Sequence, residues 1–112
     1  MGRNRKYSRC NLPRGIEQIV CGVCADLDRR CEAVRRGDVR GGVLDLYKRL
    51  NEAVEVASVC VEPEIREYII RDIAASRGYD YSICSSYVAK NTFYKKKRQL
   101  VYEIAKKLEL IE

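Results

Sequence analysis

Apolar residues recur at intervals of three and four along most of the chain, and this helical period restricts the fold more than any other feature. Between residues 14 and 36 the spacings are 4, 3, 4, 4 and 3, at Ile16, Val20, Val23, Leu27, Cys31 and Val34. No stretch alternates apolar and polar residues as a half-buried strand does. With only two Pro and seven Gly in 112 residues, the chain has room for long helices. The sequence therefore predicts an all-α fold.

Turn and capping residues set the expected ends of the helices. Pro13 and Gly37 flank the first one, and Pro63 begins the third at a first-turn position that proline tolerates. The predicted helices cover residues 14–36, 43–59, 63–76 and 90–108, and residues 79–88 are expected to form a short helix and a turn. The inner faces of the second and third helices are predicted at Val43, Tyr47, Leu50, Val54 and Ala57, and at Ile65, Tyr68, Ile69 and Ile73.

These helices predict a single domain of four to five helices over residues 14–112, after a basic tail of residues 1–13. A short loop joins the first two helices, so we expect them to lie antiparallel with their stripes facing each other. They would form a helical hairpin over residues 14–60. The remaining helices occupy residues 62–112.

The amino acid content excludes several classes of function. The chain has no His, which removes Ser–His and Cys–His catalysis and His-ligated metal sites. No carboxylate pair, phosphate-binding loop or activated nucleophile is evident, so we expect neither an enzyme nor a cofactor. The longest uninterrupted apolar stretch, residues 19–25, is seven residues, whereas a membrane span needs about 20. Without a membrane span or a secretory signal, the expected location is the cytoplasm.

Six cysteines raise the question of a metal site or disulfides. Cys21 and Cys24 form a CxxC pair, but a structural zinc site needs a second pair that the chain lacks. Cys24 and Cys31 also fall on the apolar side of the first helix, where a thiol acts as a small hydrophobe. Buried, reduced cysteine is the favoured interpretation, and zinc or disulfides are the less favoured alternatives. We expect no metal ligands.

The formal net charge of +6 is concentrated in two segments. Residues 1–14 hold five basic residues and no acid, and residues 90–98 again hold five basic residues and no acid. Residues 15–89 hold ten basic and 13 acidic residues. Segments this dense in one sign repel themselves, which favours a partner of opposite charge such as a phosphate backbone. The alternative is an ordinary solvated helix face with a flexible tail.

The last predicted helix separates an apolar face from a basic one. On a wheel of 100° per residue, Phe93, Leu100, Val101, Ile104 and Leu108 gather on one side. The other side carries Asn91, Thr92, Lys95, Arg98, Gln99, Tyr102 and Lys106. Lys97 falls in the apolar sector and would have to extend its ammonium out to solvent. A major groove accepts a helix of this kind, because Lys and Arg bind phosphate or guanine, Asn and Gln pair with adenine, and Thr contacts a thymine methyl.

The same residues carry a resemblance to a known family. Asn91-Thr92-Phe93-Tyr94-Lys95-Lys96-Lys97-Arg98, followed by Val101-Tyr102-Glu103-Ile104-Ala105-Lys106-Lys107-Leu108, resembles the C-terminal end of phage transcriptional regulators of the RinA/ArpU type. Residues 14–30 are also similar to the N-terminal helix of such proteins. The resemblance implies a sigma-factor-like helix-turn-helix within residues 62–112.

Carried onto this chain, the resemblance implies that Lys90, Asn91 and Thr92 begin the recognition helix. Phe93 would anchor that helix to the domain. The implied DNA contacts are Lys95, Lys96 and Arg98. Ala89 stands where a capping Ser or Thr is usual, so Asn91 is an alternative cap.

The leading hypothesis is a phage or prophage DNA-binding protein in a bacterial host, acting as a transcriptional regulator without catalysis. Its last helix would read the major groove of double-stranded DNA, and the tail would add phosphate contacts through Arg3, Arg5, Lys6 and Arg9. A homodimer is expected if the DNA site is palindromic, and RNA polymerase is a further partner that the resemblance implies. The alternatives are a phage packaging protein of the small-terminase kind and a helical module that binds an acidic protein.

Overall fold

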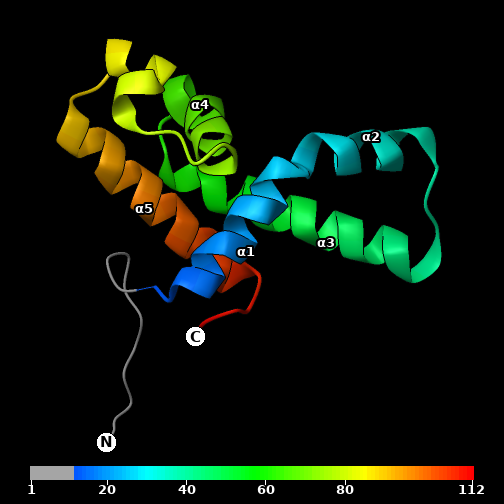
Figure 1. Cartoon of the computed structure of the whole chain (residues 1–112). Coiled ribbons are helices and arrows are strands. Elements are labelled where there is room, and N and C mark those ends of the chain that lie inside the picture. The colour runs from blue at the N-terminus through cyan, green and yellow to red at the C-terminus, as the bar shows by residue number, and fades with distance from the viewer. Residues whose placement is uncertain (1–11) are drawn as a thin grey trace, which may run out of the picture.

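Five α-helices make up most of residues 12–112, the part of the chain that this computed structural model describes (Figure 1). They are α1 (Arg14–Ala25), α2 (Leu27–Arg36), α3 (Gly41–Ala57), α4 (Pro63–Ala74) and α5 (Lys90–Lys107). Three short 3₁₀ turns lie between them: η1 (Ser58–Cys60), η2 (Tyr79–Tyr81) and η3 (Ile83–Ser86). The described residues contain no strand, and the predicted all-α class with four to five helices is confirmed.

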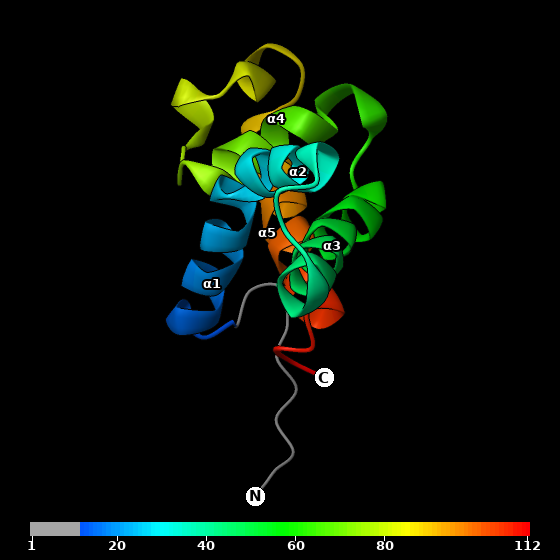
Figure 2. The ribbon, with the colours of Figure 1, turned by 90° about the vertical axis from the view of Figure 1, so that its right-hand side faces the viewer.

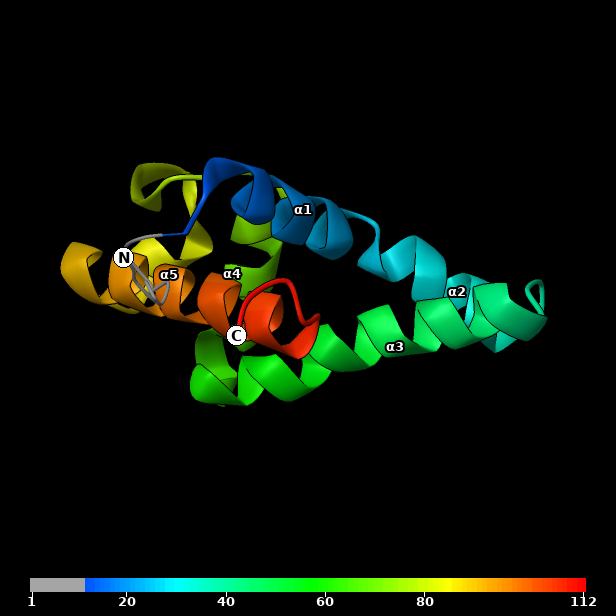
Figure 3. The same ribbon diagram turned by 90° about the horizontal axis from the view of Figure 1, so that it is seen from below.

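The helices are arranged as a body with one projecting arm. α1 packs against α4 and α5, and α5 also packs against α3, so α5 lies between α1 and α3 (Figure 2). α2 and α3 pair with each other and extend away from α4 and α5 as a hairpin (Figure 3). The predicted hairpin of residues 14–60 is therefore correct only for its outer part, because α1 turns away to join the body.

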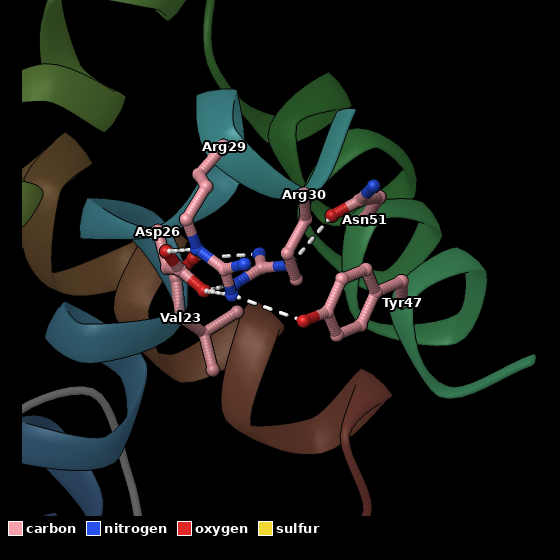
Figure 4. A network of polar contacts seen from close by, with 6 residues as sticks. All are labelled: Val23, Asp26, Arg29, Arg30, Tyr47 and Asn51. Atoms are coloured by element: carbon pink, nitrogen blue, oxygen red, sulfur yellow. Dashed lines mark hydrogen bonds and ion pairs between the residues drawn. The ribbon is translucent and has the colours of Figure 1, made fainter. Parts of the chain in front are cut away.

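The predicted continuous helix over residues 14–36 is wrong, because it breaks at Asp26. In an unbroken helix the carbonyl of Val23 would accept the N–H of Leu27. Here it accepts a hydrogen bond of 2.7 Å from the guanidinium of Arg30 (Figure 4). A side chain that binds a carbonyl within the hydrogen-bond ladder is a known cause of helix kinks. The break is what lets α1 and α2 pack against different partners.

Arg30 is the centre of a polar network at this branch point. Its side chain is only 2% exposed, and its Nε donates to Oδ1 of Asn51 on α3 at 2.7 Å. One guanidinium nitrogen also lies 3.6 Å from the Asp26 carboxylate. Burial lowers the pKa of Arg30, and Asp26 opposes that shift. Because buried charge is costly unless it is paired, these contacts fix where the hairpin leaves the body.

A second layer of this network lies at the surface. Arg29 donates to both oxygens of Asp26 at 2.6 Å, and this hydrogen bonding lowers the pKa of the carboxyl group. Arg29 also donates to the Tyr47 hydroxyl at 3.1 Å and lies over the Tyr47 ring. α1, α2 and α3 are thus joined by contacts that converge on residues 26–30.

The core lies where α1, α3, α4 and α5 meet. Its most deeply buried apolar side chains, each at most 1% exposed, are Val20, Val54, Val61, Ile69, Ile73, Cys84, Phe93, Leu100, Ile104 and Ala105. The predicted inner face of the third helix is confirmed at Ile65, Ile69 and Ile73, with Tyr68 half-buried. On α3 the stripe is buried only near its C-terminal end, at Val54 and Ala57. Val43 is 49% exposed, because the start of α3 lies on the hairpin beyond the body.

The connection from α4 to α5, residues 75–89, holds no α-helix. α4 ends two residues earlier than predicted, with Ser76 in the left-handed region at φ 52°. The predicted short helix over residues 79–88 is a pair of 3₁₀ turns, η2 and η3. A helix-turn-helix joins its helices by a turn of about three or four residues, so the support for α5 here has a different form.

Buried polar contacts hold this connection in place. The Ser82 hydroxyl donates to Asp72, a carboxylate that is 1% exposed, and Arg77 pairs with the same group at 3.1 Å. The Tyr79 hydroxyl donates to the carbonyl of Val88 at 2.7 Å, just before α5 begins. η2 and η3 are therefore tied both to α4 and to the start of α5.

The cysteines within residues 12–112 are free thiols. Cys24 and Cys84 are buried as the favoured interpretation predicts, and burial raises the pKa of Cys24 to about 12. Cys31 is a correction, because it lies on the hairpin and is exposed. Cys21 and Cys60 are partly exposed, and Cys10 lies outside the described residues. No cluster of three or more potential metal ligands occurs among the described residues.

Candidate nucleic-acid interface

One face of α5 anchors the helix to the body. Phe93 is fully buried, with the Tyr79 ring centroid at 5.5 Å and the Tyr94 ring centroid at 4.9 Å, both edge-on. Leu100, Val101, Ile104 and Ala105 continue this buried face toward the C-terminus of the helix. The predicted apolar sector is thus confirmed, with Leu108 half-buried just beyond the helix end.

Lys97 lies in the apolar sector of α5, and its ammonium has a defined partner. Its stem runs past the Phe93 ring, with Nζ 5.7 Å from the ring centroid. The ammonium donates to the carbonyl of Arg77 at 2.7 Å. The predicted extension of the ammonium out to solvent is therefore a correction: Lys97 is only partly exposed, and a backbone carbonyl of the α4–α5 connection accepts its hydrogen bond.

The opposite face of α5 is open to solvent. Asn91, Thr92, Lys95, Arg98 and Lys106 are exposed, and Gln99 and Tyr102 are partly exposed. Figure 1 shows α5 along the outer edge of the body, on the far side from the hairpin. Lys90, at the first position of the helix, is exposed as well. Of the predicted site residues, the structure brings together Lys90, Asn91, Thr92, Lys95, Arg98 and Gln99; we call these six residues the α5 basic face.

α5 differs from the rest of the described molecule in how few of its cations are in ion pairs. Of the ten basic residues in 15–89, seven form ion pairs with acidic side chains. α5 holds seven basic residues and one acidic residue, and only Lys96 is in an ion pair with a described residue. The body thus neutralises most of its own cations, whereas α5 does not.

Lys96, one of the predicted site residues, is in an ion pair with an acidic side chain. Its ammonium lies 2.8 Å from a carboxylate oxygen of Glu62 at the start of α4, and its side chain is 23% exposed. This hydrogen bond lowers the pKa of Glu62, which keeps the carboxylate charged. Lys96 holds α5 against α4 and lies outside the α5 basic face.

The N-terminus of α5 adds positive potential to this surface. The helix begins at Lys90, and the preceding Ala89 provides no side-chain cap. Asn91 lies inside the helix, so its alternative role as the cap is wrong. The first-turn N–H groups therefore have no capping side chain, and the positive end of the helix dipole faces the same region as Lys90.

The predicted tail contacts Arg3, Arg5 and Lys6, together with Arg9, lie outside the described residues. Within the described part, sequence reasoning missed the pairing of Lys96 with Glu62. No local signal reports it, because the two residues are far apart in the chain and meet only when α4 packs on α5.

No family model, curated protein or solved structure matches this chain. Among residues 12–112, no helix has the combination of length and apolar character that crossing a bilayer requires.

Proposed function

We propose that this protein binds double-stranded DNA and that α5 lies in the major groove. The observation that carries the proposal is the α5 basic face: exposed cations that no described acidic side chain neutralises, on a helix held firmly by its other side. A surface of unpaired cations attracts a polyanion and releases its counterions on binding. The mechanism is binding alone, without a chemical step.

The size and chemistry of α5 suit this role. Its 18 residues span about 27 Å at 1.5 Å per residue, and a major groove about 12 Å wide admits one helix. Lys90, Lys95 and Arg98 supply contacts to phosphate or guanine. Asn91 and Gln99 have the amide groups that pair with adenine, and Thr92 has a methyl group that can meet thymine.

The regulatory role is the part of the proposal that depends on the resemblance to RinA/ArpU-type regulators. On that reading the protein is a phage or prophage transcriptional regulator that acts in the bacterial cytoplasm. The 3₁₀ turns η2 and η3 take the place of the supporting helix of a helix-turn-helix. A homodimer and RNA polymerase are the further partners of this proposed role.

The test is fluorescence anisotropy of a labelled 20-base-pair duplex, titrated with the full chain over a salt series. If about five phosphates are neutralised, the slope of log K against log salt should be about −4.5. A random duplex reports the non-specific term, and a duplex from the promoter region of the same genome reports specificity. Absence of binding at low salt would contradict the proposal and favour an acidic protein as the partner of α5.

A further inference from the structure

A groove lies beside the α5 basic face, between α1 and α5, with a volume of about 420 Å³. Arg14 and Gln18 line it from α1, and Lys97 and Arg98 line it from α5. Ile73 and Val101 contribute apolar surface.

The groove is cationic, and its two arginines have no acidic partner in the part of the chain that the structure describes. Arg14 and Arg98 are both exposed, one on each wall, and neither forms an ion pair with any residue that the structure describes. Glu17 is the one acidic residue among the lining residues, and it is not in an ion pair either. Lys97 adds a third positive charge, although its ammonium already donates to the carbonyl of Arg77.

Two guanidinium groups from separate helices suit an oxyanion that accepts several hydrogen bonds at once. Arg14 is also the first residue of the 12-residue helix α1, so the positive end of that helix dipole adds to the field in the groove. A carboxylate or a phosphate would satisfy this chemistry. The position of the groove, sharing Arg98 with the α5 basic face, favours a phosphate of the molecule that α5 contacts.

We infer that this groove holds a backbone phosphate of the bound duplex, clamped between Arg14 and Arg98. The inference rests on the proposed function and adds α1 to the interface. α5 then contacts bases and phosphates within the major groove, while α1 fixes the position of the protein on the flanking strand. Arg14 is a phosphate contact that positions the complex and does not read sequence.

The experiment compares Arg14→Ala with Arg40→Ala in the same anisotropy salt series. Both variants remove one exposed arginine without an acidic partner among the described residues, but Arg40 lies at the far end of the hairpin. Losing one phosphate contact should reduce the slope of log K against log salt by about one, and weaken binding roughly 5- to 10-fold at moderate salt, for random and specific duplexes alike. Arg40→Ala should match the wild type. Arg14→Lys should recover the slope, because it restores the charge.

The outcomes separate the two proposals. If wild-type protein binds duplex and Arg14→Ala behaves like Arg40→Ala, the clamp is overturned while DNA binding by α5 stands. If the wild type fails to bind duplex, both are overturned. As a further arm, NMR of the arginine Nε–H signals follows a titration with inorganic phosphate alone. Saturation at micromolar phosphate would identify a small-anion site and overturn the assignment to the DNA backbone.

Discussion

Replacing Lys95 and Arg98 together by glutamate is expected to weaken duplex binding at least about 100-fold at moderate salt. Each cation that contacts DNA is worth roughly 1–3 kcal/mol, and a carboxylate in its place also repels the phosphates. Both side chains are exposed, so the change should leave the fold intact. Anisotropy measures the affinity, and circular dichroism with urea unfolding checks that helix content and stability are retained.

The matched control reverses the same number of charges elsewhere. Arg40→Glu with Lys48→Glu alters two exposed cations of the hairpin that have no acidic partner among the described residues. That variant changes only the long-range electrostatic field at the DNA. Because physiological salt screens charges that are more than about 8 Å away, its affinity for the duplex should fall no more than a few-fold. Equal losses in the two variants would mean that net charge, and not the α5 basic face, drives binding.

The second large effect is on stability. Phe93→Ala should lower the free energy of unfolding by about 3–5 kcal/mol, the usual range for removing a fully buried aromatic ring. Phe93 is 0% exposed and packs edge-on against Tyr79 and Tyr94, so its loss leaves a cavity between α5 and the α4–α5 connection. Urea unfolding followed by circular dichroism gives this value, provided that the m-value is unchanged.

Two comparisons test the reason for that loss. Phe93→Leu keeps most of the apolar volume and should cost clearly less than Phe93→Ala. Tyr81→Ala removes an aromatic ring that is 84% exposed and should change stability by about 0.5 kcal/mol or less. If Phe93→Ala were no more destabilising than Tyr81→Ala, Phe93 would not be the residue that holds α5 in place.

α5 is the element that the sequence predicted best. Its observed bounds, Lys90–Lys107, differ from the predicted range by one residue, and both of its faces have the predicted orientation. The reason is that its apolar and charged residues repeat at helical spacing, so the pattern alone predicts which side is buried, although α1, α3 and α4 all pack against that side. The same holds for α4, whose inner residues repeat at helical spacing.

The break at Asp26 could not be predicted from periodicity, because the apolar stripe runs through it without interruption. The contacts that stabilise it join Arg30 to Asn51 on α3 and to the carbonyl of Val23. A side chain such as Arg30 shows in the sequence only as one more arginine on a helix. Its burial depends on where α3 returns, which local propensity does not encode.

The candidate site also has a part that local sequence pattern predicts and a part that depends on long-range packing. The α5 basic face could be predicted, because its residues lie on one helix and their spacing alone brings them together. The pairing of Lys96 with Glu62 and the groove shared by Arg14 and Arg98 could not, since both depend on how distant helices pack. Tertiary packing therefore pairs one of the predicted residues with a carboxylate and brings Arg14 beside Arg98, neither of which the local sequence pattern reports.

The central claim, that the exposed face of α5 contacts DNA, is tested most directly by lysine footprinting. The full chain is acetylated briefly with and without saturating duplex, and mass spectrometry measures the extent of modification at each lysine. We predict strong protection of Lys90 and Lys95 by the duplex, with Lys48 on the hairpin modified equally in both samples. Equal modification of Lys95 in the two samples, while anisotropy shows the duplex to be bound, would contradict the claim.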